Sequence, residues 1–246
     1  PIKNGADLIL ASNVFAHSDD LKTMAESMRE LIKEDGKIVI EVQYLLNTIK
    51  DLTFDNIYHE HTNYWSLSTI TDFLKKLGLI VFRAEKINTH GGSIRVYVSK
   101  NKKEKIDTSV KKLLKDEEDF GLKNINTYID FGNKIENLKK NVLNNIKKLK
   151  KSNKILIGYG APAKATTALN YFNISEEIDY IIEDNTLKHK KFVPGVKIPI
   201  QPKDHCKIQN PTILVLAWNF FDNIKKDNNK LTSNFISIKD LENKKF

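Results

Sequence analysis

The sequence predicts an α/β fold with two sheets, and three observations carry this prediction. Short apolar runs of strand length alternate with segments of helical periodicity. In the last third of the chain the strands are apolar throughout and alternate with helices, which is typical of a parallel, doubly wound sheet. A long segment of helical character separates the two regions. We expect domains at residues 1–104 and 153–246, joined by a helical connection at 105–152.

The first region begins with an apolar run that predicts a strand at residues 8–16. Residues 21–33 carry apolar side chains at helical spacing, after two aspartates. Asp35-Gly36 predicts a turn, and residues 37–42 predict the next strand. This strand–helix–strand order favours a parallel pair.

A second group of elements completes this region. Ser66 predicts the capped start of a helix that runs to residue 77 and ends at Gly78. Residues 79–86 and 93–99 predict two further strands, joined through the Gly91-Gly92 turn and expected to be antiparallel.

The connection at 105–151 has apolar residues three to four positions apart over much of its length. A coiled coil is one interpretation, but the repeat is short and Gly121 and Gly132 interrupt it. We favour a connecting helix.

The last region predicts strands at 154–158, 178–183 and 212–217, with a helix that ends near residue 171. A glycine turn lies between the first strand and the helix. This order predicts the doubly wound sheet.

Composition limits the class of protein. The chain has 246 residues, a net charge of +9 and one cysteine, Cys206, so it has neither an internal disulfide nor a cysteine zinc site. Its lysines are scattered along helix faces, which favours a solvated surface over an anion-attracting field and does not indicate nucleic-acid binding. No apolar run approaches the ~20 residues of a membrane span, and no signal peptide is evident. We expect a cytoplasmic protein.

Four consecutive residues, Tyr58-His59-Glu60-His61, carry side chains that move protons near neutral pH. A carboxylate can fix the tautomer of an imidazole, and a phenol can donate to an oxygen that gains charge. The group suits removal of a proton next to a carbonyl, although a polar loop with ordinary histidines stays open. A metal site is not expected, because no third ligand stands at a recognisable spacing.

The turn Gly158-x-Gly160-x-x-Ala163 matches the dinucleotide-binding pattern, and Asp184 follows at the end of the next strand. The pattern alone favours NAD. Pro162 is unusual at such a turn, whereas Lys164 suits a phosphate. A structural turn without a ligand stays open.

Four segments, in this order, resemble the sugar C-methyltransferases, which use S-adenosylmethionine to methylate a carbon of nucleotide-linked keto-deoxysugars. The resemblance covers residues 7–219, and the second and fourth segments are specific to the family. The segments are Asn13-Val14-Phe15-Ala16-His17, Tyr58-His59-Glu60-His61, His90-Gly91-Gly92-Ser93 and Gly158-Tyr159-Gly160-Ala161-Pro162-Ala163-Lys164.

The resemblance implies a fold made of the carboxyl-terminal half of a methyltransferase sheet followed by a Rossmann-like domain. The Gly-rich cofactor turn and the amino-terminal zinc domain of similar proteins are absent, so we expect a part of a longer protein, with zinc only in that missing domain. We also expect this chain alone to bind S-adenosylmethionine poorly.

The resemblance also implies roles for individual residues. His61 is the expected base, Glu60 orients an imidazole, Tyr58 donates to the enolate oxygen, and His17 belongs to the same active site. Asn13 is expected to contact the cofactor.

The expected substrate is a nucleotide-linked sugar, with its diphosphate at the glycine turn. The residues expected to bind it are Gly158, Gly160, Ala163, Lys164, Arg95 and His90. For Arg95 an exposed strand position is an equal alternative.

Two other functions stay open. An NAD-dependent oxidoreductase is supported by the glycine turn alone, and a non-catalytic nucleotide-sugar binding module would keep the fold without the chemistry. The sequence does not predict an oligomeric state.

Overall fold

The structure is a computed structural model that describes residues 5–89, 91–151 and 155–243. Contacts divide the chain into two compact units. The first consists of residues up to Phe54 together with His59–Phe131, and the second consists of Asp55–Tyr58 and the chain from Gly132 onward. Tyr58, the first residue of the Tyr58-His59-Glu60-His61 motif, therefore belongs to the second unit.

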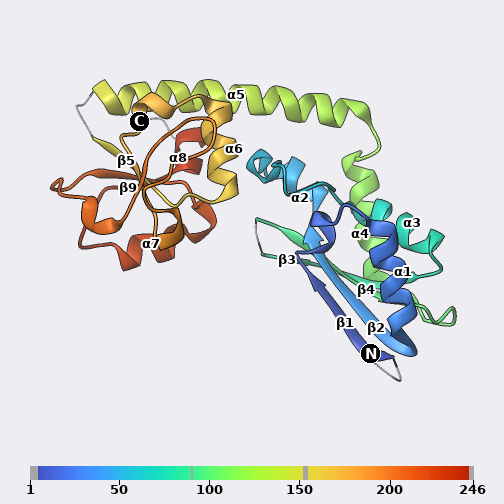
Figure 1. Ribbon diagram of the computed structural model, residues 1–246. Coiled ribbons are helices and arrows are strands. Elements are labelled where there is room, and N and C mark those ends of the chain that lie inside the picture. The colour runs from blue at the N-terminus through green and yellow to red at the C-terminus, as the bar shows by residue number, and fades with distance from the viewer. Residues whose placement is uncertain (1–4, 90, 152–154, 244–246) are drawn as a thin grey trace. The chain divides into compact units, whose positions relative to one another are not determined.

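The first unit contains a four-stranded sheet in the order β1-β2-β4-β3 (Figure 1). β1 pairs with β2 in parallel, whereas β4 pairs with β2 and β3 in antiparallel fashion, as the sequence predicted for the last two strands. The bounds are β1 Ala6–Ser12, β2 Ile32–Gln43, β3 Ile80–Ile87 and β4 Ser93–Ser99.

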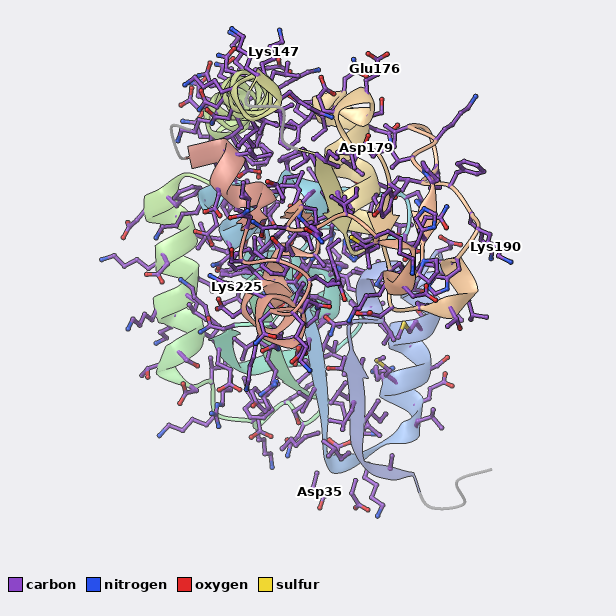
Figure 2. The ribbon with its side chains drawn as sticks, turned by 90° about the vertical axis from the view of Figure 1, so that its left-hand side faces the viewer. Asp35, Lys147, Glu176, Asp179, Lys190 and Lys225 are labelled. Carbon is purple, nitrogen blue, oxygen red and sulfur yellow. The ribbon has the colours of Figure 1, made fainter. Side chains whose placement is uncertain are left out.

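The predicted turn at Asp35-Gly36 is wrong, because β2 continues through it. The β1–β2 register shifts there: Ala6 pairs with Ile32, but Leu8 pairs with Lys37. A Cβ at Gly36 would lie 2.8 Å from the Ala6 carbonyl oxygen, so glycine lets the bulge pack against β1. Figure 2 shows Asp35 at the outer tip of this strand pair.

The predicted first strand is also too long. β1 ends at Ser12, and residues 15–17 form a short 3-10 helix, η1 (Phe15–His17). The backbone leaves the strand at Asn13, which has a φ of +54°. Asparagine tolerates this left-handed conformation better than most residues, so it is suited to end the strand here.

Besides η1, four α-helices lie wholly within the described part of the first unit, and η2 begins there at Phe54 and continues into the second unit. Ser66 caps α3 in a capping box with Thr69, as predicted, and Asp20 caps α1 by accepting from the Thr23 amide at 3.0 Å. The short helices α2 and η2 were not predicted. The bounds are α1 Leu21–Leu31, α2 Leu45–Lys50, η2 Phe54–Asn56, α3 Leu67–Lys76 and α4 Thr108–Phe120.

A buried carboxylate ties α4 to the start of α3. Glu117 is 3% exposed and accepts hydrogen bonds from the amides of Leu67 (2.5 Å) and Ser68 (3.0 Å) and from the Tyr44 hydroxyl (2.9 Å). These amides are the free donors at the helix N-terminus, where negative charge is favourable. Burial and the nearby Glu117 carboxylate raise the pKa of Tyr44, so this phenol stays protonated.

The predicted connecting helix is two helices, because Gly121 ends α4. Gly121 adopts a φ of +82° and its amide donates to the carbonyl oxygens of Glu117 and Glu118. The second helix, α5 (Ile125–Lys151), runs through Gly132 without a break. Glycine therefore stops the helix only where the backbone turns left-handed.

The second unit contains a five-stranded, all-parallel sheet in the order β7-β6-β5-β8-β9, which confirms the doubly wound prediction. Strands β7 and β9 are two and three residues long and were not predicted. The bounds are β5 Leu156–Tyr159, α6 Ala163–Phe172, η3 Ser175–Glu177, β6 Ile181–Ile182, η4 Thr186–Lys188, β7 Ile200–Gln201, η5 Lys203–His205, β8 Thr212–Val215, η6 Trp218–Phe220, α7 Phe221–Asp227, β9 Phe235–Ser237 and α8 Ile238–Asn243.

The lysines spread over separate elements of the second unit. Figure 2 shows Lys147 on α5, Lys190 after η4 and Lys225 on α7, all of them exposed. Among the described residues, no helix combines the length and apolarity needed to cross a bilayer.

Candidate active site

The candidate site of the first unit lies just beyond the carboxyl end of β1. The Asn13 amide donates to the Glu41 carbonyl oxygen at 2.9 Å and so extends the parallel ladder by one bond. The chain then turns through η1, which presents His17. The carboxyl ends of parallel strands are where α/β sheets place their ligands.

The structure brings His61 to this strand end. The rings of His17 and His61 lie 4.8 Å apart, measured between centroids, with their planes inclined by 61°. Thr62 holds the segment in place, since its amide and its hydroxyl both donate to the Ala16 carbonyl oxygen at 3.1 Å. Two histidines separated by 44 positions in the sequence thus share one site.

The two imidazoles differ in exposure. His61 is 9% exposed, whereas His17 is exposed to solvent. The His61 ring also contacts Tyr64 edge-on, at 6.5 Å between centroids. A largely buried imidazole between two rings keeps its orientation, which is what a general base requires.

The middle residues of the motif point to solvent. The side chains of His59 and Glu60 are 85% and 59% exposed, and Glu60 Oε1 lies 3.9 Å from His59 Nε2. Glu60 thus has His59 within ion-pair distance, and an orienting action of Glu60 on His61 stays a prediction. Within the same described residues, no three His, Cys, Asp or Glu side chains gather in a way that would hold a metal ion.

Tyr58 falls on the other side of the unit boundary. It belongs to Asp55–Tyr58, which packs with the second unit, whereas His61 belongs to the first. The two residues are three positions apart in sequence, so chain connectivity limits the separation of their Cα atoms to about 10 Å.

Arg95 lies at the centre of an ion-pair network across three strands. Its guanidinium donates to Glu41 Oε2 at 3.0 Å and to Glu85 Oε1 at 3.2 Å. Thr89 donates to the other oxygen of Glu41, and Tyr97 donates to Glu85. The bonds with Glu41 and then with Tyr97 and Glu85 raise the pKa of Arg95. Substrate binding by Arg95 stays a prediction, and His90, for which the same role is expected, lies outside the described residues.

The glycines of the turn after β5 have packing reasons. A Cβ at Gly158 would lie 2.7 Å from the Ile181 side chain, and one at Gly160 would lie 2.9 Å from Ala217. Gly160 also adopts a φ of +83°. Ala163 is the first residue of α6, as expected for such a turn.

A carboxylate already accepts a hydrogen bond from one amide of this turn, that of Ala161. The Ala161 amide donates to Glu183 Oε2 at 2.8 Å, and Lys188 donates to the Ala161 carbonyl oxygen at 2.9 Å. Burial raises the pKa of Glu183, but the amides of Asn185 and Ala161, with Lys188 nearby, lower it by more. The glycine turn therefore receives its negative charge from the protein itself.

A hollow of about 310 Å³ lies beside this turn, at the carboxyl ends of β5, β6 and β8. Glu183, Asp184 and Lys188 line it, together with Tyr159. The Tyr159 hydroxyl lies 2.9 and 3.0 Å from the two oxygens of Asp184, and burial followed by this bond raises the pKa of Tyr159. Each of its two carboxylates has a lysine nearby, since Lys188 stands 3.6 Å from Glu183 and Lys203 stands 3.9 Å from Asp184.

Lys164 lies in a buried group of charged residues. The residue is 8% exposed, and its ammonium stands 5.0 Å from the centre of the Trp218 ring. Burial lowers the pKa of Lys164, while the Asp55 carboxylate opposes this effect. Sequence reasoning missed both Asp55 and Trp218. The position of Trp218 directly after the predicted strand at 212–217 was the available signal, because strand ends carry functional side chains.

Two protein families match the chain. The C-methyltransferase C-terminal domain matches residues 88–237, which is more than half of the chain, and a methyltransferase domain matches residues 3–83.

A curated relative agrees with this match. The chain is 29% identical over 218 residues to the C-methyltransferase NovU of Streptomyces niveus. The match covers 87% of this chain and 52% of NovU, so the chain spans about half the length of this relative.

Solved methyltransferases show only a partial likeness. The mitomycin 7-O-methyltransferase MmcR is 20% identical with a TM-score of 0.34, covering 39% of this chain and 30% of that one. An S-adenosylmethionine-dependent methyltransferase from Clostridium acetobutylicum is 16% identical with a TM-score of 0.32, covering 40% and 60%. Scores this low carry no functional conclusion. The match over residues 88–237 shows that the chain belongs to the C-methyltransferase family, a family of enzymes.

Proposed function

We propose that this chain carries the proton-transfer residues of an S-adenosylmethionine-dependent C-methyltransferase. The proposed substrate is a nucleotide-linked 4-keto-deoxysugar, methylated at the carbon beside the ketone. The observation that carries the proposal is the contact between His17 and His61 at the carboxyl end of β1, in a chain of the C-methyltransferase family. The substrate class rests on the motif resemblance.

The chemistry requires an acidic C–H bond, a base and an enolate-stabilising donor. In our proposal His61 accepts the proton from the carbon beside the ketone, and the C–H electron pair moves to form the enolate. The Tyr58 hydroxyl donates to the enolate oxygen as it gains charge. His17 holds the His61 ring by edge contact and keeps one face of the site polar.

S-adenosylmethionine, when bound, supplies the methyl group to the carbon nucleophile. The described residues fit only part of such a site. Asn13 stands at the carboxyl end of a parallel strand, where a cofactor is expected, but no glycine-rich turn follows β1 or β2 in the described part of the first unit. We propose that the chain contributes residues for proton transfer and substrate orientation, with Asn13 toward the cofactor.

The geometry of the glycine turn favours this function over an NAD-dependent oxidoreductase. A dinucleotide pyrophosphate needs free amides at the turn. Here the Ala161 amide donates to Glu183, and the same carboxylate would repel the pyrophosphate. A diphosphate role for Gly158, Gly160, Ala163 and Lys164 meets the same obstacle and stays a prediction.

The decisive test is hydrogen exchange on the substrate. The full-length enzyme should exchange the proton beside the ketone of a dTDP-linked 4-keto-6-deoxysugar with D₂O, followed by NMR, and should methylate that carbon when S-adenosylmethionine is added. Methylation of an oxygen, or no exchange at any carbon, would contradict the proposal.

Calorimetric titration distinguishes the proposed methyltransferase from an NAD-dependent oxidoreductase. The full-length enzyme should bind dTDP and should not bind NAD at millimolar concentration. Binding of NAD without dTDP would favour the oxidoreductase.

A further inference from the structure

The segment that leads into the motif is held by a tryptophan from the far end of the chain. Trp218 Nε1 donates to Asp55 Oδ2 at 2.5 Å, across 163 positions of sequence. Asp55 is 2% exposed, and its second oxygen has no hydrogen-bond partner among the described residues. The indole N–H is thus the donor that fixes a buried carboxylate.

The bond lies within a buried group of charges. The ammonium groups of Lys164 and Lys239 stand 5.0 and 5.4 Å from the centre of the Trp218 ring. Lys239 also pairs with Glu242 at 3.0 Å, and Glu242 is 4% exposed. Lys164 interacts with the Asp55 carboxylate, and both ammonium groups contact the Trp218 ring, which restricts the movement of the indole.

The same unit contacts the segment at a second point. The Thr167 hydroxyl on α6 lies 3.4 Å from the Ile57 carbonyl oxygen, a long hydrogen bond. The second unit thus holds Asp55 by a short bond and contacts the Ile57 carbonyl weakly, and Tyr58 is the next residue. Tyr58 lies three residues from Asp55, so their Cα atoms are at most about 10 Å apart. A shift of Asp55 is therefore expected to displace Tyr58.

We propose that Trp218 and Asp55 are positioning residues, which hold the segment at 55–58 so that Tyr58 reaches the oxygen of the substrate ketone. The inference rests on the proposed function, because it concerns the phenol of the same site. Neither residue touches the reacting atoms. The anchor acts by placing Tyr58, and misplacement of a donor by about 1 Å can cost up to about 100-fold in rate.

The test uses Trp218→Phe in the full-length enzyme. This change keeps an aromatic ring for the two lysines but removes the N–H donor together with one of the two fused rings. We expect the kcat of substrate proton exchange into D₂O to fall about tenfold or more, with KM changed less than about twofold, because substrate binding is left intact.

Tyr171→Phe is the matched control. The Tyr171 hydroxyl donates to Glu136 at 2.6 Å, and Lys139 stands 4.9 Å from the ring centre, so the change removes another aromatic-to-carboxylate hydrogen bond from the same unit, at an exposed position. We expect exchange within about twofold of the wild type. Thermal unfolding of both variants shows how much stability each bond contributes.

Two changes at Asp55 distinguish positioning from general damage. Asp55→Asn keeps an oxygen acceptor and should retain most of the exchange rate, whereas Asp55→Ala should lose as much as Trp218→Phe. The double variant Trp218→Phe, Asp55→Ala should be no slower than the slower single variant, since both remove one bond.

Each result has one meaning. Exchange by Trp218→Phe within about twofold of the wild type, or an equal loss in Tyr171→Phe, would overturn the inference and leave the proposed function standing. A wild-type enzyme that neither exchanges nor methylates the sugar carbon would overturn the proposed function and the inference with it.

Discussion

The imidazoles of His17 and His61 meet edge to face, 4.8 Å apart between ring centroids, although the chain between them includes α1 and β2. The contact exists because Thr62 donates twice to the Ala16 carbonyl oxygen. The two hydrogen bonds of Thr62 thus place His61 beside the end of β1.

His61→Asn should stop exchange of the substrate proton in the full-length enzyme, with a loss of about 100-fold or more, because asparagine cannot accept the proton. NMR in D₂O measures the exchange. His59→Asn is the matched control, since the His59 side chain is 85% exposed and should change the rate less than about threefold. Undiminished exchange in His61→Asn would remove His61 from the role of base and leave Tyr58 or His17.

Glu117→Ala should destabilise the protein by about 3 kcal/mol in urea denaturation. The change leaves two helix amides and the Tyr44 hydroxyl without their buried acceptor. Glu118→Ala, at the exposed neighbouring position, should cost less than about 0.5 kcal/mol. Equal effects at both positions would show that the buried carboxylate is not what ties α4 to α3.

The two glycines of the helical connection should respond to alanine in opposite directions. Gly132 lies inside α5 with open space around an added Cβ, so Gly132→Ala should stabilise by about 0.5–1 kcal/mol. Gly121 has a φ of +82°, so Gly121→Ala should destabilise by about 1 kcal/mol. Thermal unfolding of the two variants measures both. A stabilised Gly121→Ala would show that α4 does not end in the left-handed turn.

Because of Glu183, we expect the free energy of unfolding to depend on pH. Its pKa in the folded protein is lowered, so the ionised form contributes stability above its ordinary pKa of about 4.3, and this contribution is lost as the pH falls through the folded value. Glu183→Gln should therefore lower the free energy of unfolding by about 1 kcal/mol at pH 7, with the partial exposure of the group taken into account. The difference should shrink steadily below pH ~4.3.

Glu176→Gln serves as the control for this pH experiment, because the Glu176 side chain points outward from η3 (Figure 2). It should change the free energy of unfolding by less than about 0.5 kcal/mol. A difference between the wild type and Glu183→Gln that stayed constant from pH 7 to pH 3 would mean that the charge of Glu183 does not matter at the turn.

The sequence predicted correctly those elements that depend mainly on residues close together in the chain. The strand at 93–99 agrees with β4 to the residue, and Ser66 caps α3 as its side chain favours. At Asp35-Gly36 the local signal was misleading, because pairing with β1 extends β2 through a glycine that would otherwise turn. Strands β7 and β9 have too few residues for a periodic pattern.

The sequence by itself determined the two sheets, the caps and the motif whose chemistry suggests proton transfer, since periodicity and residue type are local properties. Only the tertiary structure decided which groups meet. In the folded chain Glu183 accepts a hydrogen bond from the Ala161 amide, and the buried Lys164 contacts the Trp218 ring. Asp55 belongs to the second unit. These contacts join residues 22 to 163 positions apart, and their free energy depends on burial and hydrogen-bond geometry, which exist only when the chain is folded.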